Sequence, residues 1–416
     1  MRFFRTQSVA EVRQLIDRLA RPLAAEEVSL SQAWGRVLAE DVRAPADLPP
    51  FDRGMVDGYA VRAEDTFGAS AGLPAYLTVI GEVLMGEATD LAVGPGEAVK
   101  SATGGMLPRH ANAVVMVEHT NPVDETLVEI LRPVAPGENV IRRGEDVKQG
   151  EMLLRRGQRL RPQDLGALAG LGILRVQVAQ QPRVALIPTG DEIVPPDQTP
   201  GPGQIRDINT YSLAGLVGEA GGLPVPFPIV PDEASALRAA VAQALAQAEI
   251  VLISGGSSVG ARDVTLDVLL SFPGAELHVH GVAVRPGKPT ILVTIPYKGA
   301  RNEYRVVFGL PGNPVSVMVT FDLFVRPLVQ GMLGLRKPPW ERLIVKAKMR
   351  TGFASDAGRE EYVRVRLVEE EGVLWAEPVL GTSALISTMV KADGLVTVPE
   401  EVGGMEVGEE VEVTLF

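Results

Sequence analysis

The stretch from residue 183 to 330 constrains the fold most, because short apolar runs alternate there with segments of helical periodicity. The apolar runs are Val184–Ile187, Ile250–Ile253, Ile291–Ile295 and Arg305–Phe308, with an extended segment at 224–230; the helical segments are 210–220, the alanine-rich stretch from Asp232 to Ala248, and 314–330. Short, fully apolar runs are typical of strands buried on both faces, and their alternation with helices is typical of a parallel sheet. We therefore predict a three-layer α/β/α domain with a parallel sheet.

Different patterns flank this stretch. Ser8 and Glu11 have capping-box spacing and apolar residues follow at helical intervals, which predicts a helix over residues 9–20; a second helix is expected near Ser29. The proline-dense segment 44–50 indicates a boundary. Residues 51–145 have the pattern of a β-rich domain, a further short helix opens at Arg161, and the chain after residue 334 has the pattern of a small all-β domain. The expected chain is multidomain, with β domains and a helical N-terminal region around the α/β domain.

Composition narrows the possible chemistry. Forty basic and 52 acidic side chains among 416 residues give a formal net charge of −12, which argues against a surface built to hold nucleic acid. The absence of cysteine excludes thiolate chemistry, and four histidines leave little material for a histidine metal site. The sequence has no pattern of a secretory signal and no run of ~20 apolar residues, so we expect a cytoplasmic protein that does not enter a membrane.

Four loops next to the predicted strands have compositions suited to binding an anion. They contain Thr189, Gly190 and Asp191; Ser254, Gly255, Gly256 and Ser258; Arg285, Lys288 and Pro289; and Pro311, Gly312, Asn313, Pro314 and Ser316. Small residues let backbone N–H groups approach a ligand, and the basic and hydroxyl groups add donors. One such loop alone is more often a tight turn, but four at one sheet edge predict an anion site. P-loop and Rossmann glycine patterns are missing from the sequence, which disfavours those enzyme classes.

Carboxylates accompany these loops. Asp57, Asp146, Asp191, Glu192, Asp232 and Asp263 fall in predicted loops or at helix starts. Mg²⁺ takes oxygen ligands and pairs with phosphate, so acidic residues beside an anion site suggest a metal-bridged phosphate. For Asp232 a helix cap or a solvated charge is the favoured alternative, because this residue also begins the alanine-rich helix. His278 and His280 share one face of a strand-like segment, but packing is favoured over metal binding there.

Seven motifs occur in the order seen in a known family. They are Met55–Ala60, Ala102–Gly104, Arg142–Asp146, Thr189–Glu192, Ser254–Asp263, Pro286–Pro289 and Gly309–Ser316. Over essentially its whole length the chain resembles MoeA and the gephyrin E domain. The resemblance implies molybdopterin molybdotransferase activity, in which molybdate is inserted into adenylylated molybdopterin with Mg²⁺-dependent loss of AMP. It also implies an elongated, L-shaped homodimer of four-domain chains, in which the α/β domain is of the molybdopterin-binding type.

The resemblance also assigns boundaries and roles. It places a split N-terminal domain at 1–46 plus 147–179, a β-rich domain at 47–146, the α/β domain at 180–332 and a small β-barrel-like domain at 333–416. It implies catalytic roles for Asp57, Thr103, Asp146, Glu192 and Asp263, and metal ligands among Asp191, Glu192 and Asp263. It implies molybdate ligands at Arg285, Lys288, Pro289, Arg364 and Ser383, and substrate contacts at Asp232 and at the small and polar residues of the other three loops.

The chain departs from the common family pattern at Ser257, Arg285 and Gly281, positions that bear on molybdate affinity rather than on the reaction class. Two alternatives stay open. The α/β domain alone also resembles a molybdopterin adenylyltransferase, although the flanking domains disfavour that activity. A non-catalytic, gephyrin-like scaffold is the other alternative, and the complete acidic set argues against it. Other molybdenum-cofactor biosynthesis proteins and apo-molybdoenzymes are the partners that the resemblance implies.

Overall fold

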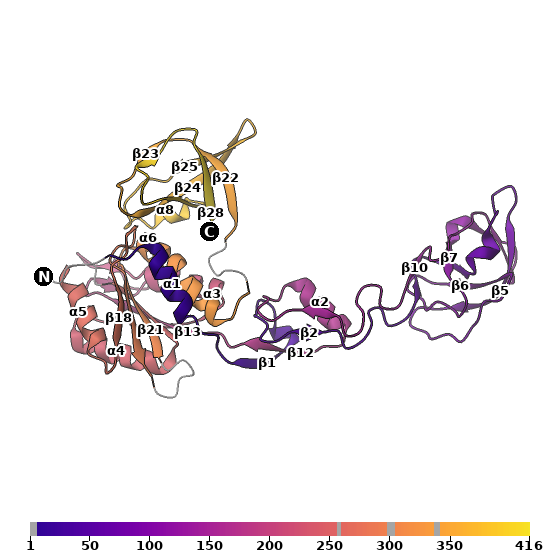
Figure 1. Cartoon of the computed structure of the whole chain (residues 1–416), viewed down its shortest axis with the longest axis horizontal. Coiled ribbons are helices and arrows are strands. Elements are labelled where there is room, and N and C mark those ends of the chain that lie inside the picture. Colours follow the sequence, from indigo (N-terminus) through magenta and orange to yellow (C-terminus); the bar gives the residue numbers. More distant parts are fainter. Residues whose placement is uncertain (1–5, 256–258, 298–303, 337–341) are drawn as a thin grey trace.

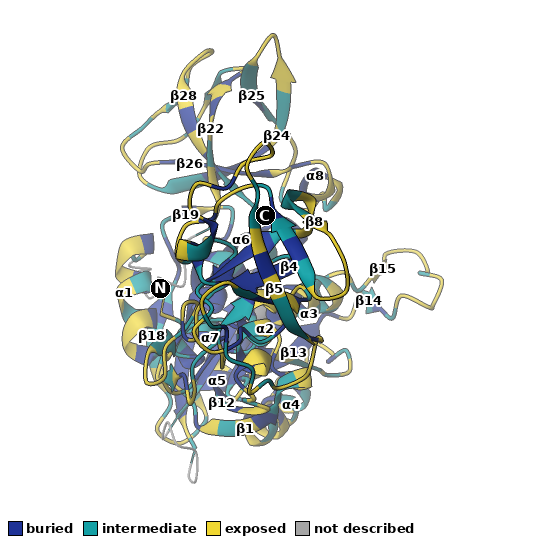
Figure 2. Cartoon of the chain, turned by 90° about the vertical axis from the view of Figure 1, so that its right-hand side faces the viewer, coloured by how far each residue is buried: buried dark blue, intermediate teal, exposed yellow. Residues whose placement is uncertain are grey.

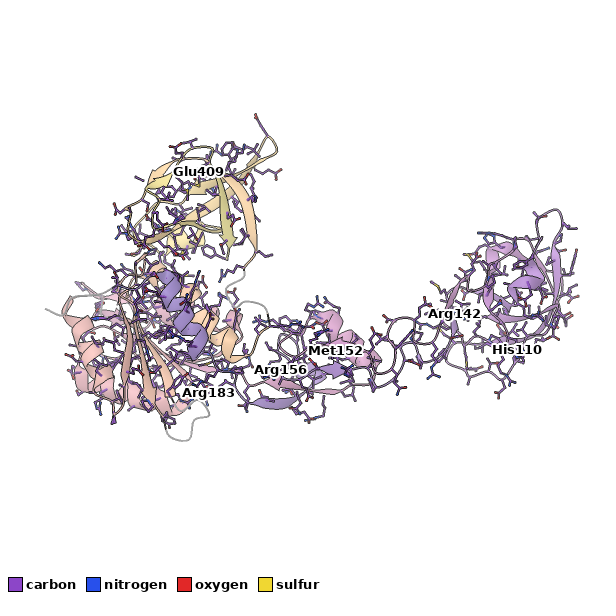
Figure 3. The ribbon with its side chains drawn as sticks, in the orientation of Figure 1. His110, Arg142, Met152, Arg156, Arg183 and Glu409 are labelled. Carbon is purple, nitrogen blue, oxygen red and sulfur yellow. The ribbon has the colours of Figure 1, made fainter. Side chains whose placement is uncertain are left out.

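Four regions form an elongated chain in the computed structural model, which describes residues 6–255, 259–297, 304–336 and 342–416, and of residues 259–263 the backbone alone. The α/β region lies at one end and carries the C-terminal β region on one side of it (Figure 1). The split region lies in the middle, and the β-rich region lies at the far end. Labelled side chains mark the course of the chain from His110 and Arg142 at the far end, through Met152 and Arg156, to Arg183 and Glu409 (Figure 3).

The α/β region is built on a six-stranded sheet. Its strand order is β16 (Leu223–Pro226), β13 (Arg183–Thr189), β17 (Ile250–Gly255), β21 (Tyr304–Leu310), β20 (Ile291–Pro296) and β18 (Glu276–His280). One face carries α3 (Asn209–Ala220) and the helix α6 (Pro314–Thr320), η4 (Phe321–Val325) and α7 (Arg326–Met332); the other carries α4 (Ala234–Gln247) and α5 (Val259–Leu270). Along β13, Val184 and Leu186 enter the first core while Ala185 and Ile187 enter the second, so the predicted three-layer fold is confirmed.

The sheet is mixed rather than wholly parallel. Strands β16, β13, β17 and β21 run parallel, but β20 is antiparallel to β21 and to β18. This reversal matters for the site, because the loop 285–289 precedes β20. In a parallel sheet that loop would lie at the opposite edge from the loops that follow β13, β17 and β21. The antiparallel direction pairs Ile291 with Gly309 and so brings all four predicted loops to one edge.

The first helix belongs with the α/β core. Helix α1 (Val9–Leu19) begins with the predicted capping box, in which Ser8 Oγ accepts from the Glu11 amide and the Glu11 carboxylate accepts from the Ser8 amide. Its apolar face, Val9, Val12, Ile16 and Leu19, is buried in the same core as α7. The packing of α1 therefore differs from the expectation that residues 1–46 fold together in the split region.

The split region is formed by two stretches that lie far apart in the sequence. Strand β1 (Ala25–Ser29) pairs with β12 (Arg175–Ala179), β2 (Val42–Arg43) pairs with β11 (Met152–Leu154), and α2 (Pro162–Gly170) covers them. The predicted helix near Ser29 is wrong. Only a single 3₁₀ turn, η1 (Leu30–Gln32), follows β1, because β12 draws the preceding backbone into a ladder and the Leu30 amide donates to the Leu174 carbonyl.

The β-rich region holds a second six-stranded sheet. Its order is β7 (Ala113–Met116), β4 (Gly58–Val61), β6 (Glu97–Ser101), β5 (Ala75–Val83), β9 (Leu127–Ile130) and β8 (Thr120–Pro122). Short elements complete it: β3 (Arg53–Gly54) paired with β10 (Val140–Ile141), and the 3₁₀ turns η2 (Ala63–Thr66) and η3 (Val117–His119). Its own apolar core includes Val61, Val115 and Ile130, as predicted for a separate β-rich region.

The C-terminal region is a closed small β-barrel. Strands β24 (Glu360–Glu370), β25 (Val373–Pro378), β22 (Ile344–Met349), β28 (Glu410–Leu415) and β26 (Gly394–Val398) follow one another, and β24 pairs with β26 to close the ring. Strand β23 (Phe353–Ala354) pairs with β27 (Gly404–Met405), and α8 (Ser387–Val390) is a single turn. In addition, β19 (Val284–Arg285) of the α/β region pairs with β24 and joins the two regions through their backbones.

Two further features complete the fold. A small arm, β14 (Ile193–Val194) paired with β15 (Ile205–Arg206), projects from the α/β region (Figure 2). The helical stretch Pro314–Met332 is long and apolar enough to cross a membrane, but 78% of its most apolar window is buried inside the α/β region, as expected for the core helix that Figure 2 colours dark blue.

Candidate active site

A large cavity lies between the α/β region and the barrel. It has a volume of about 640 Å³. The residues predicted to bind molybdate all line it, namely Arg285, Lys288, Pro289, Arg364 and Ser383, together with Pro311, Gly312, Asn313 and Ser316 of the loop after β21. Four cationic side chains and one carboxylate line the cavity, so its charge favours an anion.

Arg285 is held between the two regions. Its backbone lies in β19 opposite Glu361 of β24, and its guanidinium forms ion pairs with Glu361, at 3.3 Å from Nε, and with Asp356, at 3.4 Å from Nη1. Next along the turn, Gly287 has φ +124°, and a Cβ there would lie 2.5 Å from Thr320 Cγ2. Glycine is therefore needed for the turn to pass close to α6 and direct Arg285 and Lys288 to one side.

Lys288 contrasts with Arg285 because it is exposed and, among the described residues, its ammonium has no ion-pair partner. An unpaired cation at the mouth of an otherwise cationic cavity is free to bind an incoming oxyanion.

Arg364 lies deeper in the cavity wall. The residue is 9% exposed, its Nη2 donates to the Gly381 carbonyl at 2.8 Å, and its Nε has no hydrogen-bond partner among the described residues. Burial lowers the pKa of this guanidinium, with the nearby Glu361 charge opposing the shift. A buried donor without a partner is costly to leave unpaired, so an anion in the cavity would satisfy it.

Ser383 ties the barrel to the loop after β21. The Asn313 amide nitrogen donates to Ser383 Oγ at 2.9 Å, and the Val315 amide donates to the Ser383 carbonyl at 3.1 Å. Asn313 also precedes Pro314 at the start of α6, with no side-chain capping bond of its own. The structure thus brings together three separate segments of the chain, 285–289, 311–316 and 359–383.

An acidic group lies at the other end of the same sheet edge, after β13. The Asp232 amide donates to Asp191 Oδ1 at 3.1 Å, and the Glu192 carboxylate lies over Gly190, 2.7 Å from where a Cβ would stand. Burial raises the pKa of Asp232, and the charges of Asp191 and Glu192 raise it further. A cavity of about 630 Å³ opens beside Gly190 and Asp191 and is lined by Thr210, Tyr211 and Phe227.

The acidic group fits Mg²⁺ that arrives with a phosphate. Within the described residues, no three carboxylate or imidazole groups converge as a preformed metal site. Burial and, after it, the charges of Asp191 and Glu192 raise the pKa of Asp232, so a nearby cation would favour the ionised carboxylates. Mg²⁺ commonly uses one or two carboxylates plus substrate phosphates, which this arrangement can supply.

Some of the predicted site residues are not fully described by the structure. Gly256 and Ser258 lie outside the described residues, and only the backbone of Asp263 is described, within α5. Next to them, Gly255 approaches Thr189 so closely that a Cβ would lie 2.0 Å from the Thr189 carbonyl oxygen, at φ +138°. Ser254 and Thr189 are both buried at this edge.

Asp232 does not cap α4. The N-cap position is Glu233, and no side-chain capping bond is present there. Asp232 instead belongs to the acidic group with Asp191, so the favoured cap interpretation was wrong. The preference for packing at His278 agrees with its hydrogen bond to Thr294 Oγ1, at 2.7 Å, and with burial that lowers the pKa of the imidazole.

A separate pair of predicted catalytic residues meets in the β-rich region. Asp57 precedes β4, Thr103 follows β6, and the two strands pair with Gly58 opposite Ser101. Asp57 Oδ1 accepts from the Thr103 amide at 2.7 Å and from Thr103 Oγ1 at 2.9 Å, and these bonds, the amide first, lower the pKa of Asp57. Both residues are exposed, and their region lies at the opposite end of the chain from the cavity (Figure 1).

Asp146 stands apart from that pair. It lies in the connection between the β-rich and split regions, where its amide donates to the Leu48 carbonyl at 3.1 Å. In the described part of the chain its carboxylate has no hydrogen bond to Asp57 or Thr103.

Sequence reasoning missed several cavity residues, namely Phe353, Glu361, Val379, Gly381 and Thr382. Most of these residues belong to ordinary strand patterns or turns. Their place in the cavity depends on how the barrel docks, which no local pattern encodes.

Comparisons with known proteins agree along the whole chain. Residues 7–172 match the MoeA N-terminal region (domain I and II), residues 185–331 a probable molybdopterin binding domain, and residues 346–416 the MoeA C-terminal region (domain IV). A molybdopterin molybdenumtransferase of Nostoc sp. is 39% identical over 84% of this chain and 78% of its own length. A molybdopterin molybdenumtransferase of Bacillus subtilis is 34% identical over 94% of this chain and 90% of its own length.

A solved structure is also similar. The crystal structure of a molybdopterin biosynthesis MoeA protein from Pyrococcus horikoshii gives a TM-score of 0.83 at 35% identity and covers 99% of this chain and 100% of that one. Identities above 30% over most of both chains, with the same multidomain fold, establish that this chain belongs to the MoeA family.

Proposed function

We propose that this chain, a molybdopterin molybdenumtransferase, binds molybdate in the cavity between the α/β region and the barrel and inserts it into adenylylated molybdopterin, with Mg²⁺-dependent release of AMP. One observation carries the proposal: every residue expected from the sequence to bind molybdate lines that single cavity. These residues come from three segments and two structural regions, so chance proximity is a poor explanation.

The cationic side chains have the donors that an oxyanion requires. Lys288 has no competing ion pair among the described residues, and Arg364 presents a buried Nε without a partner. Charge-assisted hydrogen bonds from such groups are the strong ones, and Ser383 and Asn313 add neutral donors at the same wall. The cavity therefore orients the oxyanion and excludes bulk water on the barrel side.

The acidic group is assigned to the phosphates of the substrate. Asp191, Glu192 and Asp232 would hold Mg²⁺ together with the pyrophosphate, and the metal would neutralise the charge that develops as AMP leaves. The sheet order supports this division, because β20 and β21 border the oxyanion cavity whereas β13 and β16 border the acidic end. With strands about 4.8 Å apart, the two ends are roughly 10–20 Å apart, a span that suits a pterin nucleotide.

Asp57 and Thr103 require a second chain under this proposal. Both were expected to be catalytic, yet their region lies far from the α/β edge of the same chain. A homodimer in which the β-rich region of one chain reaches the cavity of the other would complete the site. The elongated shape leaves that region free to do so.

The alternatives lack a supporting observation. An adenylyltransferase formed by the α/β region alone would lack Arg364 and Ser383, which come from the barrel. A scaffold would not need a buried guanidinium in a cationic cavity with an Nε that has no partner among the described residues. We place the reaction in the cytoplasm, with apo-molybdoenzymes and other cofactor-biosynthesis proteins as partners and without nucleic acid or membrane, in keeping with the net charge of −12.

The deciding experiment incubates the pure full-length chain with adenylylated molybdopterin, Mg²⁺ and molybdate and measures AMP. We expect release that requires both the metal and the oxyanion. AMP release that proceeds equally fast without molybdate would reject the coupling. Omitting the pterin substrate serves as the blank.

A further inference from the structure

A buried cluster of charges joins three regions of the chain behind the cavity. Its centre is Asp322, whose side chain is 12% exposed. Asp322 Oδ1 accepts from Arg326 Nε at 2.9 Å and from Arg342 Nη2 at 2.7 Å, and Arg326 Nη1 pairs with Glu219 at 3.2 Å. Arg159 of the split region donates to the Ala220 carbonyl, at 3.2 Å, beside this group.

Asp322 occupies an unusual position in its helix. It lies in the π-helical turn η4, between α6 and α7. A π turn interrupts the regular helix and is frequent at functional positions. The same helix begins at Pro314, and its N-cap residue Asn313 and its Ser316 line one wall of the oxyanion cavity. Asp322 is therefore rigidly connected to that wall.

Arg342 connects the cluster to the opposite wall. It lies two residues before β22, and its Nη1 donates to the carbonyl of Leu415 at the end of β28, so its guanidinium is fixed to the barrel. The barrel in turn carries Arg364 and Ser383 into the cavity. One carboxylate thus holds the barrel at a set distance from the helix that starts at the cavity.

We propose that Asp322 is a positioning residue that sets the separation of the two cavity walls through its shared ion pairs with Arg326 and Arg342. A purely stabilising pair would not need to bridge two regions, and apolar residues would fill the same space at lower desolvation cost. The burial of Arg326 supports the proposal. This residue is 4% exposed and its Nη2 has no partner among the described residues, so its charge depends on the carboxylates of the cluster.

The first test measures geometry and needs no reaction. The chain has no cysteine, so spin labels can be attached at two introduced cysteines, Ser235→Cys on α4 and Glu401→Cys on the barrel, both at exposed positions. Electron double resonance on the full chain should give a narrow distance distribution. We expect Asp322→Asn and Arg342→Gln to broaden it, and Arg342→Gln keeps Asp322 paired with Arg326 if the first variant folds poorly.

The matched control is Glu249→Gln, which removes another partly buried carboxylate that pairs with an arginine, Arg305, at 3.1 Å. This pair lies where β17 and β21 begin, at the sheet edge opposite the cavity, and does not touch the barrel. The distance distribution of Glu249→Gln should stay narrow. Distributions that stay narrow in both test variants, or that broaden equally in the control, would overturn the proposal.

The second test rests on the proposed function. The molybdate concentration for half-maximal AMP release should rise about tenfold in Asp322→Asn and Arg342→Gln, because a wall displaced by about 1 Å loses directed donors. The concentration of pterin nucleotide for half-maximal release should stay unchanged. Broadened distances with unchanged molybdate half-saturation would refute the positioning role. A wild-type chain without molybdate-dependent AMP release would instead refute the proposed function, and the distance measurement would still decide whether Asp322 fixes the barrel.

Discussion

The two ends of the molecule assemble their polar groups in different ways. At the α/β end, the cavity draws on three segments from two regions, and its cations face few counter-charges. At the β-rich end, Asp57 and Thr103 meet across two neighbouring strands and satisfy each other through two hydrogen bonds. The cavity has unsatisfied donors and enough volume for a ligand. The Asp57 and Thr103 pair is exposed and would have to act on a ligand held elsewhere. This difference is what we expect if, as proposed above, one chain holds two incomplete parts of a site.

The largest expected effect tests directly whether the two ends of the molecule contribute to one site. At low molybdate, Asp57→Ala should lower the rate of AMP release by at least about a hundredfold and Lys288→Ala by roughly ten- to a hundredfold, because each removes a group from every composite site. After subunit exchange, half of the dimers are mixed and each mixed dimer keeps one intact site. Activity should then return to about a quarter of the wild-type value.

The matched mixture is Arg285→Ala with Lys288→Ala. Both changes lie on the same cavity, so their mixed dimers contain no intact site and should stay inactive. Verified exchange without recovery in the Asp57 mixture would place the whole reaction within one chain.

The next effect sharpens the description of the cavity. Lys288→Ala should raise molybdate half-saturation by roughly ten- to a hundredfold, because a charge-assisted hydrogen bond contributes ~1.5–3 kcal/mol. Arg285→Lys should change it much less, since an ammonium still supplies the charge even though Glu361 and Asp356 would lose the planar fork. Titration of AMP release with molybdate gives both values. Unchanged half-saturation in Lys288→Ala and Arg285→Ala would remove these residues from the oxyanion site.

The contrast between the ends also explains what the sequence could predict. Apolar runs such as Ile250–Ile253 and the capping box at Ser8 act locally, and both formed as expected. The direction of β20 is not local, because it depends on the hairpin with β21, and the parallel prediction missed it. For the site, the loops at 285–289 and 311–316 carried recognisable composition. Glu361 was not predicted to take part in the site, since its ion pair with Arg285 forms only when β19 pairs with β24.

A smaller effect concerns the acidic group. The folded chain raises the pKa of Asp232 above its ordinary value of 3.8, so ionising this carboxyl costs more folded than unfolded. Stability is therefore lost as pH rises from the ordinary value through the folded pKa, and the cost is fully present at neutral pH. Asp232→Asn should raise the Tm by ~1–2 °C at pH 7 and by nothing near pH 3.

The control for this comparison is Asp197→Asn, an exposed carboxylate between β14 and β15 that lies outside the acidic group. Added Mg²⁺ should stabilise the wild type more than Asp232→Asn, because a ligand that binds only the folded state raises Tm by mass action. A Tm for Asp232→Asn that equals or falls below the wild-type value at pH 7 would contradict the repulsion inferred here.

The smallest effect separates the two hydrogen bonds at the far end. Thr103→Val keeps the shape of the residue and the backbone amide, which is the larger cause of the lowered pKa of Asp57, and removes only the hydroxyl donor. The pKa of Asp57 should rise toward its ordinary value without reaching it. If the carboxylate is the active form, the acid limb of the rate profile should move to higher pH by less than about one unit. Thr103→Ser retains the donor and should leave the limb in place, so the two variants distinguish the loss of a hydrogen bond from the loss of a methyl group. A limb that shifts equally in both, or in neither, would show that the Thr103 hydroxyl does not tune Asp57.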